Sequence, residues 1–244
     1  MSPPDTLIVV PARNEAQSIV PLIREIRQAA PTLPILVLDD GSTDDTGPLA
    51  QAAGASVLSF AYHLGLGGCV QAAYQYAFSE GFQYVIRLDG DGQHDPRDIP
   101  RMAVALQTSG CELVIASRYL NHSATRQITP RTVGTKVFQF ILRILLDQEV
   151  TDPTSGYVGV NRRALELFSR SFPLEYPEIE ALVVLQRRAF RFKEIPTTMR
   201  AREHGRSTLT PARVVFYMIH VLLGVFVNIV RIPSPMALFR RSKQ

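Results

Sequence analysis

The chain has 244 residues, of which 46% are hydrophobic and 20% charged, so it is long enough for one large folded domain with a substantial core. A formal net charge of +4 and a sequence pI near 9.3 suit an anionic ligand or an anionic membrane surface. No nucleic-acid-binding motif and no basic run interleaved with aromatic residues is present, so we expect no nucleic-acid partner. Two cysteines are too few for a disulfide framework or a cysteine metal site, which favours a reducing compartment.

Short apolar, β-branched runs alternate with helical patterns in the first half of the chain. The runs predict strands at 7–10, 35–39, 56–60, 84–89 and 113–117. The stretches between them predict helices near 17–29, 44–53, 67–80 and 97–109. This alternation predicts an α/β fold with a mostly parallel sheet covered by helices on both faces. Farther along, residues 151–168 predict a turn, a strand and a helix.

Three polar clusters follow directly on three of the predicted strands. They are PARNE (11–15), DDGSTDDT (39–46) and DGDGQHDP (89–96). Ligands of open parallel sheets bind beyond the carboxyl ends of the strands, so we expect the three clusters to meet at one edge and form the ligand site. Pro11 has no N–H with which to extend a strand, and we expect it to mark the end of the first one.

The third cluster predicts a site for a divalent metal ion. Residues i and i+2 of a strand point to the same side, so Asp89 and Asp91 would aim two carboxylates at one point, and the glycine after each leaves room for a ligand. Oxygen ligands suit Mg²⁺ or Mn²⁺, which keep open positions for phosphate oxygens. An EF-hand is excluded, because its sixth and twelfth positions would be His94 and Pro100. The alternative is a solvated loop with helix-capping aspartates.

The second cluster has two compatible interpretations. A carboxylate of Asp39 or Asp40 is suited to accept hydrogen bonds from a base or a ribose. Ser42 or Thr43 is equally suited to cap the following helix, with two further aspartates in its first turn. The glycine-rich stretch 63–69 predicts a tight turn into a helix but lacks the spacing of a dinucleotide-binding loop.

Taken together, these motifs resemble the family 2 glycosyltransferases of GT-A fold. PARNE, DDGSTDDT, DGDGQHDPRDIP, ASRY (116–119) and TDPTSGY (151–157) stand in the order and spacing of that family, over roughly residues 5–210. The resemblance is greatest to the polyprenol-phosphate glycosyltransferases, the branch of dolichyl-phosphate mannose synthase. It implies a metal-dependent, inverting transfer from a nucleotide sugar to a polyprenyl phosphate at the cytoplasmic face of the cell membrane. We favour a UDP-sugar as donor, with GDP-mannose as the alternative.

The resemblance also implies roles for individual residues. Those placed by the nucleotide or its diphosphate are Pro11, Arg13, Glu15, Asp39, Asp40, Asp89 and Gln93. Those placed at a Mg²⁺ or Mn²⁺ ion are Asp89, Asp91 and Gln93. Those implied to act in catalysis are Asp91, Arg118, Arg131 and Arg202, with Arg118 and Arg131 facing the acceptor phosphate. Two departures stand out: Arg13 replaces a common tyrosine, and Arg206-Ser207-Thr208 lacks a lysine that many relatives carry.

The chemistry of a phosphate acceptor fits these residues. A phosphate monoester has a second pKa of about 6 and is mostly ionised at neutral pH, so it needs no strong general base. Arginines offset the charge of such an acceptor with forked hydrogen bonds. Seven basic residues between 187 and 206 predict an anion-binding group, although each alone is equally an ordinary surface residue.

Two other functions remain open. A transferase acting on a hydroxyl acceptor, in polysaccharide or cell-envelope synthesis, would need a carboxylate base, for which Asp152 and Glu178 are the candidates. A non-catalytic nucleotide-sugar binder is disfavoured by the intact pair of Asp89 and Asp91.

The C-terminal part predicts contact with a membrane. Residues 214–230 carry no formal charge and lie at the lower limit for a membrane span, and their few polar positions form one narrow stripe. Residues 132–147 repeat that arrangement, and 240–243 form a basic tail. We therefore expect peripheral or C-terminally anchored binding to an anionic leaflet. The alternative is that both helices pack on the domain core or on a second subunit.

This pattern divides the chain in two. Residues 1–210 would form the catalytic domain, including an interfacial helix at 132–147, and residues 211–244 would form an apolar helix and basic tail. Gly224 would permit close helix approach to a small membrane-protein partner or to a second copy of the chain.

Overall fold

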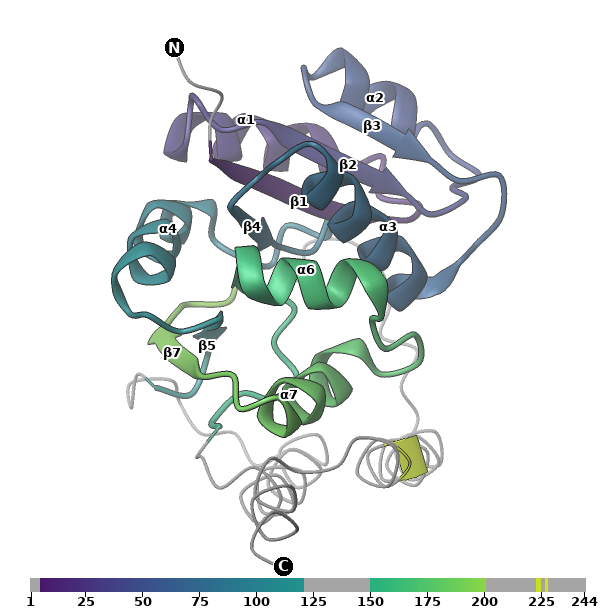
Figure 1. The fold of residues 1–244 in the computed structure, drawn as a ribbon. Helices are drawn as coiled ribbons and strands as arrows, with labels where there is room; N and C mark the ends of the chain where they lie inside the picture. The colour runs from purple at the N-terminus through teal and green to yellow at the C-terminus, as the bar shows by residue number, and fades with distance from the viewer. Residues whose placement is uncertain (1–4, 121–149, 201–222, 225–226, 228–244) are drawn as a thin grey trace, which may run out of the picture.

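The computed structural model describes residues 5–120, 150–200, 223–224 and 227. Within these residues, seven strands form one sheet in the spatial order β3-β2-β1-β4-β6-β5-β7 (Figure 1). The strands are β1 (Thr6–Ala12), β2 (Ile35–Asp39), β3 (Ser56–Ser59), β4 (Tyr84–Arg87), β5 (Leu113–Ser117), β6 (Val158–Asn161) and β7 (Phe192–Pro196). The helices described are α1 (Ile19–Ala29), α2 (Thr46–Ala52), α3 (Gly65–Ser79), the 3₁₀ helix η1 (Pro96–Asp98), α4 (Ile99–Thr108), α6 (Arg162–Arg170) and α7 (Pro177–Arg187).

Strand pairing in this sheet is parallel except at β6. Strand β1 pairs in parallel with β2 and β4, β2 with β3, and β5 with β7, whereas β6 runs antiparallel between β4 and β5. The predicted α/β fold with a mostly parallel sheet is confirmed. Because β1, β2 and β4 run in the same direction, the segments that follow them lie at one edge of the sheet.

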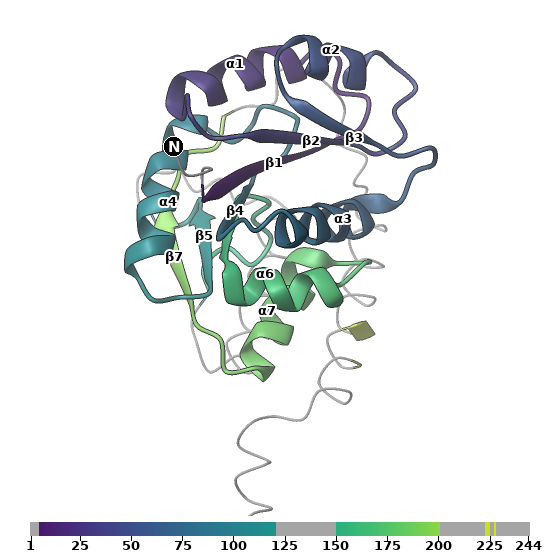
Figure 2. The same cartoon turned by 45° about the horizontal axis from the view of Figure 1, so that its top comes forward.

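Two apolar layers enclose the sheet, one on each face. In β1, Leu7 and Val9 pack with α3, α6 and α7, whereas Ile8 and Val10 pack with α1 and α4. Figure 2 shows α1 and α2 above the strands and α3, α6 and α7 below them. Successive residues of a strand point to opposite faces, so a continuous apolar run such as LIVV supplies both layers at once.

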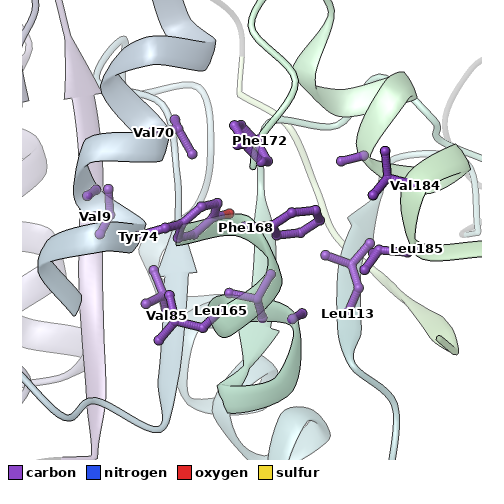
Figure 3. Packing of buried hydrophobic residues seen from close by; sticks show 14 of the residues in the cluster. Val9, Val70, Tyr74, Val85, Leu113, Leu165, Phe168, Phe172, Val184 and Leu185 are labelled. Carbon is purple, nitrogen blue, oxygen red and sulfur yellow. The ribbon is translucent and has the colours of Figure 1, made fainter. Parts of the chain in front are cut away.

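Three aromatic rings join α3 to α6 beneath the sheet. The rings of Tyr74 and Phe168 stack with centroids 5.7 Å apart, and Phe172 meets Tyr74 and Phe168 edge-on at 5.2 and 5.0 Å (Figure 3). Aromatic pairs in such geometries contribute about 0.5–1.5 kcal/mol beyond their buried area. The side chain of Asn161 caps α6 by accepting hydrogen bonds from the N–H groups of Arg163 and Ala164, which fixes the start of this helix directly after β6.

The elements predicted for the first 117 residues are all present, with ends shifted by no more than two residues. The turn, strand and helix predicted for 151–168 are also confirmed. Pro11 does not end the first strand, because it pairs opposite Leu38 and its carbonyl oxygen accepts a hydrogen bond from the Gly90 N–H at 3.1 Å. The fourth predicted strand, 84–89, ends two residues early, as β4, at Arg87.

Helix α7 and strand β7 have no counterpart among the sequence predictions. The β7 sequence FKEIP buries only Phe192 and Ile195 well, so it lacks the alternation that identifies a strand. The residues around it are notable in the sequence only for their basic charge, and charge alone does not indicate secondary structure.

The predicted helices at 132–147 and 214–230, the basic tail and the boundary at residue 210 lie outside the described residues, apart from Leu223, Gly224 and Val227. In the part of the chain that is described, no helix has the length and apolar character needed to cross a membrane. Gly224 lies against α7, where a Cβ on it would come within 2.9 Å of Glu180 Oε1. This contact is with a side chain of the same chain, and the predicted close approach to a partner stays a prediction.

Candidate active site

Hydrogen bonds connect the three polar clusters at the carboxyl edge of the sheet. The Asn14 N–H donates to Ser42 Oγ at 3.0 Å, and Asn14 Oδ1 accepts from the Thr43 N–H at 2.8 Å. On the other side, Ser18 Oγ donates to the Gly90 carbonyl oxygen at 2.9 Å and lies 2.8 Å from Glu15 Oε2. The expectation that the clusters meet at one edge is confirmed, and the segment after β1 is the link between the other two.

Asp39 is almost buried at the end of β2, with 9% of its surface exposed. Its Oδ1 accepts from the Ser42 N–H at 3.1 Å, and its Oδ2 accepts from Ser59 Oγ at 3.3 Å. A Cβ on Gly47 would lie 2.7 Å from Oδ2, so the first turn of α2 touches this carboxylate. A nucleotide that uses Asp39 must therefore bind beside these contacts.

The predicted cap of α2 is wrong. The helix begins at Thr46, and neither Ser42 nor Thr43 caps it. Instead, Asp44 Oδ1 accepts from the Thr46 N–H at 3.0 Å, and Asp44 Oδ2 accepts from the Ala16 N–H at 3.2 Å. Ser42 and Thr43 are held by Asn14, so this loop is shaped by contacts with the segment after β1.

Asp40 organises the turn that leads into α3. Its carboxylate accepts from the N–H groups of Leu64 at 2.6 Å and Gly65 at 3.1 Å, and it lies 2.7 Å from His63 Nδ1. Burial opposes ionisation of Asp40, but hydrogen bonds from Leu64, Cys69 and His63 and the charge of His63 outweigh it and lower its pKa. This geometry gives Asp40 an anchoring role at the start of α3.

The predicted metal ligands Asp89 and Asp91 lie beyond the end of β4, in a turn. Gly92 has φ +74°, so the chain bends sharply here, and the argument from strand alternation does not hold. The Asp89 side chain is 36% exposed, and Asp91 Oδ1 accepts from the Gln93 N–H at 3.1 Å. Gln93 Nε2 donates to the Arg200 carbonyl oxygen at 3.4 Å, which ties this turn to the segment after β7.

His94 supports Asp89 from inside the protein. The His94 side chain is 3% exposed, and its Nε2 lies 3.2 Å from Asp89 Oδ2. Desolvation of Asp89 favours its neutral form, but the hydrogen bond with His94 and the charges of His94, Arg87 and Arg118 hold its pKa at about 2. Asp89 is therefore an anion at any pH near neutrality, as a metal ligand must be.

The donor atoms at this turn fit Mg²⁺ or Mn²⁺ shared with a diphosphate. Asp89, Asp91 and Gln93 offer only oxygen ligands, which these ions prefer. Among the residues that the structure describes, no group of three or more His, Cys, Asp or Glu side chains is arranged to hold a metal alone. Mg²⁺ is commonly bound by one or two carboxylates together with substrate phosphates. The residues thus fit an ion whose coordination a bound diphosphate completes.

Arg118 is held by a buried carboxylate. Its Nε and Nη2 donate to Asp152 at 2.6 Å each, and its Nη2 lies 3.0 Å from Thr154 Oγ1. The Asp152 side chain is fully buried, and its own N–H donates to Glu194 of β7 at 2.9 Å. The remaining nitrogen, Arg118 Nη1, donates to Met199 Sδ at 3.6 Å.

The described members of the predicted basic group do not gather at one place. Arg191 precedes β7 and donates to the Gly110 carbonyl oxygen at 2.6 Å, at the amino end of the strands. Arg200 follows β7 at the carboxyl edge, where it pairs with Glu25 at 2.6 Å and Asp95 at 3.2 Å. The prediction of one cluster fails because β7 separates its two halves. Arg131, Arg202 and Arg206 lie outside the described residues.

Other predicted site residues occupy the expected edge. Arg13 is exposed just beyond β1, Glu15 is half-buried beside Ser18, and Pro11 lies within β1. Sequence reasoning missed the support around them, above all Arg87, Ser18, His94 and Gly156. His94 stands inside the acidic motif, but only the fold shows that it is buried.

Comparison with known proteins now decides the family. The protein-family model described as Glycosyl transferase family 2 matches residues 7–168 of this chain. The chain belongs to glycosyl transferase family 2. It is therefore a glycosyltransferase, as the motifs indicate, and its sheet and helices are those of the GT-A fold.

The similarity of this family 2 enzyme to its relatives covers most of its length. A polyprenol monophosphomannose synthase of Mycolicibacterium smegmatis is 29% identical, over 86% of this chain and 82% of its own. An undecaprenyl-phosphate mannosyltransferase of Micrococcus luteus is 29% identical, over 84% and 87%. A Methanococcus voltae relative, named UDP-N-acetylglucosamine--dolichyl-phosphate N-acetylglucosaminyltransferase, is 23% identical, over 88% and 94%.

A solved structure supports the same fold. Glucosyl-3-phosphoglycerate synthase from Mycobacterium tuberculosis, in complex with Mn²⁺, UDP and phosphoglyceric acid, superposes with a TM-score of 0.71 at 23% identity, over 95% of this chain and 80% of its own. The same enzyme is also known with Mg²⁺ and UDP, at a TM-score of 0.68.

Proposed function

We propose that this family 2 glycosyltransferase moves a sugar from a nucleotide sugar to a polyprenyl phosphate at the cytoplasmic face of the cell membrane, with inversion and with Mg²⁺ or Mn²⁺. Asp89, Asp91 and Gln93 would hold the ion, which would supply Lewis-acid stabilisation of the diphosphate leaving group. Pro11, Arg13, Glu15 and Asp39 would line the nucleotide. The relatives named for polyprenyl-phosphate acceptors support this choice of substrate.

One structural observation favours a phosphate acceptor over a hydroxyl. The two carboxylates that the sequence offers as general bases are both held in ion pairs with arginines. Asp152 is fully buried against Arg118, and Glu178 lies 3.0 Å from Arg87 with 17% of its side chain exposed. A hydroxyl acceptor requires a base that can take its proton, whereas an ionised phosphate requires none.

Arginines would supply the remaining part of the chemistry. Arg118 would contact the acceptor phosphate through Nη1, and Arg131 and Arg202 are proposed to complete the set from segments outside the described residues. Bringing two anions together is the main barrier to such a transfer, so fixed cations and correct orientation are what the protein must contribute.

The proposed donor is a UDP-sugar, with GDP-mannose as the alternative. Relatives named for mannose and for UDP-N-acetylglucosamine both cover most of the chain, and we keep the UDP-sugar as the favoured class. A nucleotide-sugar binder without catalysis is less well supported, because both Asp89 and Asp91 are present at the diphosphate edge.

A phase-partition assay tests the proposal. The purified chain is incubated with undecaprenyl phosphate in detergent, Mn²⁺, and labelled UDP-glucose, UDP-N-acetylglucosamine or GDP-mannose in turn. A chloroform-soluble, acid-labile product with one donor is the expected result. Label that is transferred only to a water-soluble hydroxyl acceptor, with none in the chloroform phase, would rule out the polyprenyl-phosphate acceptor. Binding of a donor without any product would contradict the proposed transfer to a polyprenyl phosphate.

A further inference from the structure

A buried arginine stands two residues before the proposed metal ligand Asp89. Arg87 ends β4, and its side chain is 2% exposed. Its Nε donates to the Gly156 carbonyl oxygen at 3.0 Å, and its Nη2 donates to Glu178 Oε1 at 3.0 Å. A buried guanidinium is costly unless it is paired and hydrogen-bonded, so Arg87 holds both partners firmly. They join β4 to the turn before β6 and to the start of α7.

The backbone of Gly156 lies directly beside the Asp89 carboxylate. A Cβ built on Gly156 would lie 2.3 Å from Asp89 Oδ2 and 2.7 Å from Oδ1, so the glycine backbone is in direct contact with both oxygens. His94 Nε2 approaches Oδ2 at 3.2 Å. The direction in which Asp89 points therefore depends on the position of the Gly156 backbone.

The turn that contains Gly156 is anchored from two sides. Ser155 Oγ donates to the Ala116 carbonyl oxygen of β5 at 2.7 Å, and Asp152 holds Arg118 beside the same strand. Arg87 is the contact from the β4 side, the strand that carries Asp89. A cavity of about 20 Å³, large enough for one water molecule, adjoins Arg87, Ser155 and Glu178.

We propose that Arg87, with Glu178 as its counter-ion, is a positioning residue for Asp89. It fixes Gly156, and through Gly156 it fixes the direction in which the Asp89 carboxylate faces a metal-bound diphosphate. The inference rests on the proposed function, because it takes Asp89 to be a metal ligand. Loss of a residue that orients a metal ligand commonly lowers metal affinity or activity about 10–100-fold.

Nucleotide binding with and without metal tests this role. UDP and GDP are each titrated into the purified chain by calorimetry, once with Mn²⁺ and once with EDTA. For each nucleotide, the metal gain is the affinity in Mn²⁺ divided by the affinity in EDTA. Arg87→Met is expected to lower the metal gain about 10-fold or more while leaving the affinity in EDTA unchanged. Arg87→Lys restores the charge and is expected to recover part of the gain.

A matched control separates positioning from stability. Leu7→Ala opens a cavity at the amino end of β1, far along the strand from the site, and should lower the melting temperature without changing the metal gain. An unchanged metal gain in Arg87→Met, or an equal loss of affinity in Mn²⁺ and EDTA, overturns the inference. If Arg87→Met does not fold, Glu178→Gln, which removes the counter-ion of Arg87, takes its place, and an unchanged metal gain in that variant overturns the inference.

The same measurement tells a failure of the inference from a failure of the proposed function. Wild-type protein that shows no metal gain with either nucleotide overturns the metal-dependent function, and the positioning role with it. Wild-type protein with a clear metal gain, together with an insensitive Arg87 variant, overturns the positioning role alone.

Discussion

Adding one methyl group at Gly156 should disable the proposed metal site while leaving the fold in place. The Cβ of Gly156→Ala would lie 2.3 Å from Asp89 Oδ2, whereas real Cβ contacts essentially never fall below 3.0 Å. The carboxylate must therefore retreat by at least 0.7 Å, the difference between these two distances. Gly156 does not occupy the left-handed region, so alanine adds no backbone strain there.

The expected cost follows from that displacement. A misplacement of about 1 Å at a reacting centre lowers the rate about 100-fold, and metal ligands tolerate about 0.5 Å. We expect the metal gain in nucleotide affinity, and kcat/KM once a donor is known, to fall about 100-fold. Overpacking should cost about 1–3 kcal/mol of unfolding free energy.

Gly159→Ala is the matched control. Its new methyl group would lie 2.7 Å from Leu106 Cδ1, the flexible end of an apolar side chain, and it would not touch a carboxylate. The control should lose stability by a similar amount and keep its metal gain. A Gly156→Ala protein that retains the wild-type metal gain would show that Asp89 does not need its present position, and the reasoning would be refuted.

Three further predictions concern single carboxylates. Asp91→Asn removes charge but little volume, so transfer should be abolished while the circular dichroism melting curve barely changes; surviving metal-dependent activity would mean that the pair is misassigned. Asp152→Asn removes the buried negative charge that pairs with Arg118. The free energy of unfolding measured in urea should fall by about 3–5 kcal/mol, and the KM for the acceptor should rise more than the Kd for the donor. An unchanged unfolding midpoint would contradict this. The lowered pKa of Asp40 means that the unfolded chain binds a proton first as the pH falls, so Asp40 stabilises the fold above about pH 4 and this stabilisation is lost below it. The melting temperatures of wild type and Asp40→Asn should therefore differ most above pH 5 and converge below pH 4, and a constant difference would refute the linkage.

Six of the seven strands of the described sheet and the location of the site are predicted by local sequence, whereas β7 is not. Apolar runs such as LIVV and ILVLD, followed at once by polar clusters, predict strands whose carboxyl ends meet, because strand direction alone places those clusters at one edge. The hydrogen bonds of Asn14 and Ser18 confirm that meeting.

Only the tertiary structure distinguishes residues that look alike in the sequence. Asp39 and Asp40 are identical neighbours, yet Asp39 contacts Ser42 and Ser59, whereas Asp40 anchors the start of α3. Consecutive residues at a strand end point in different directions, so each meets a different part of the chain.

The support of the proposed metal site depends on contacts between distant segments. Arg87 meets Glu178 across 91 residues, and Arg118 meets Asp152 across 34. No local pattern encodes such pairs, because each depends on how separate strands and helices pack together. The sequence alone identifies Asp89 and Asp91 as candidate ligands, and the packing of α7 and of the turn at Gly156 decides how Asp89 is held.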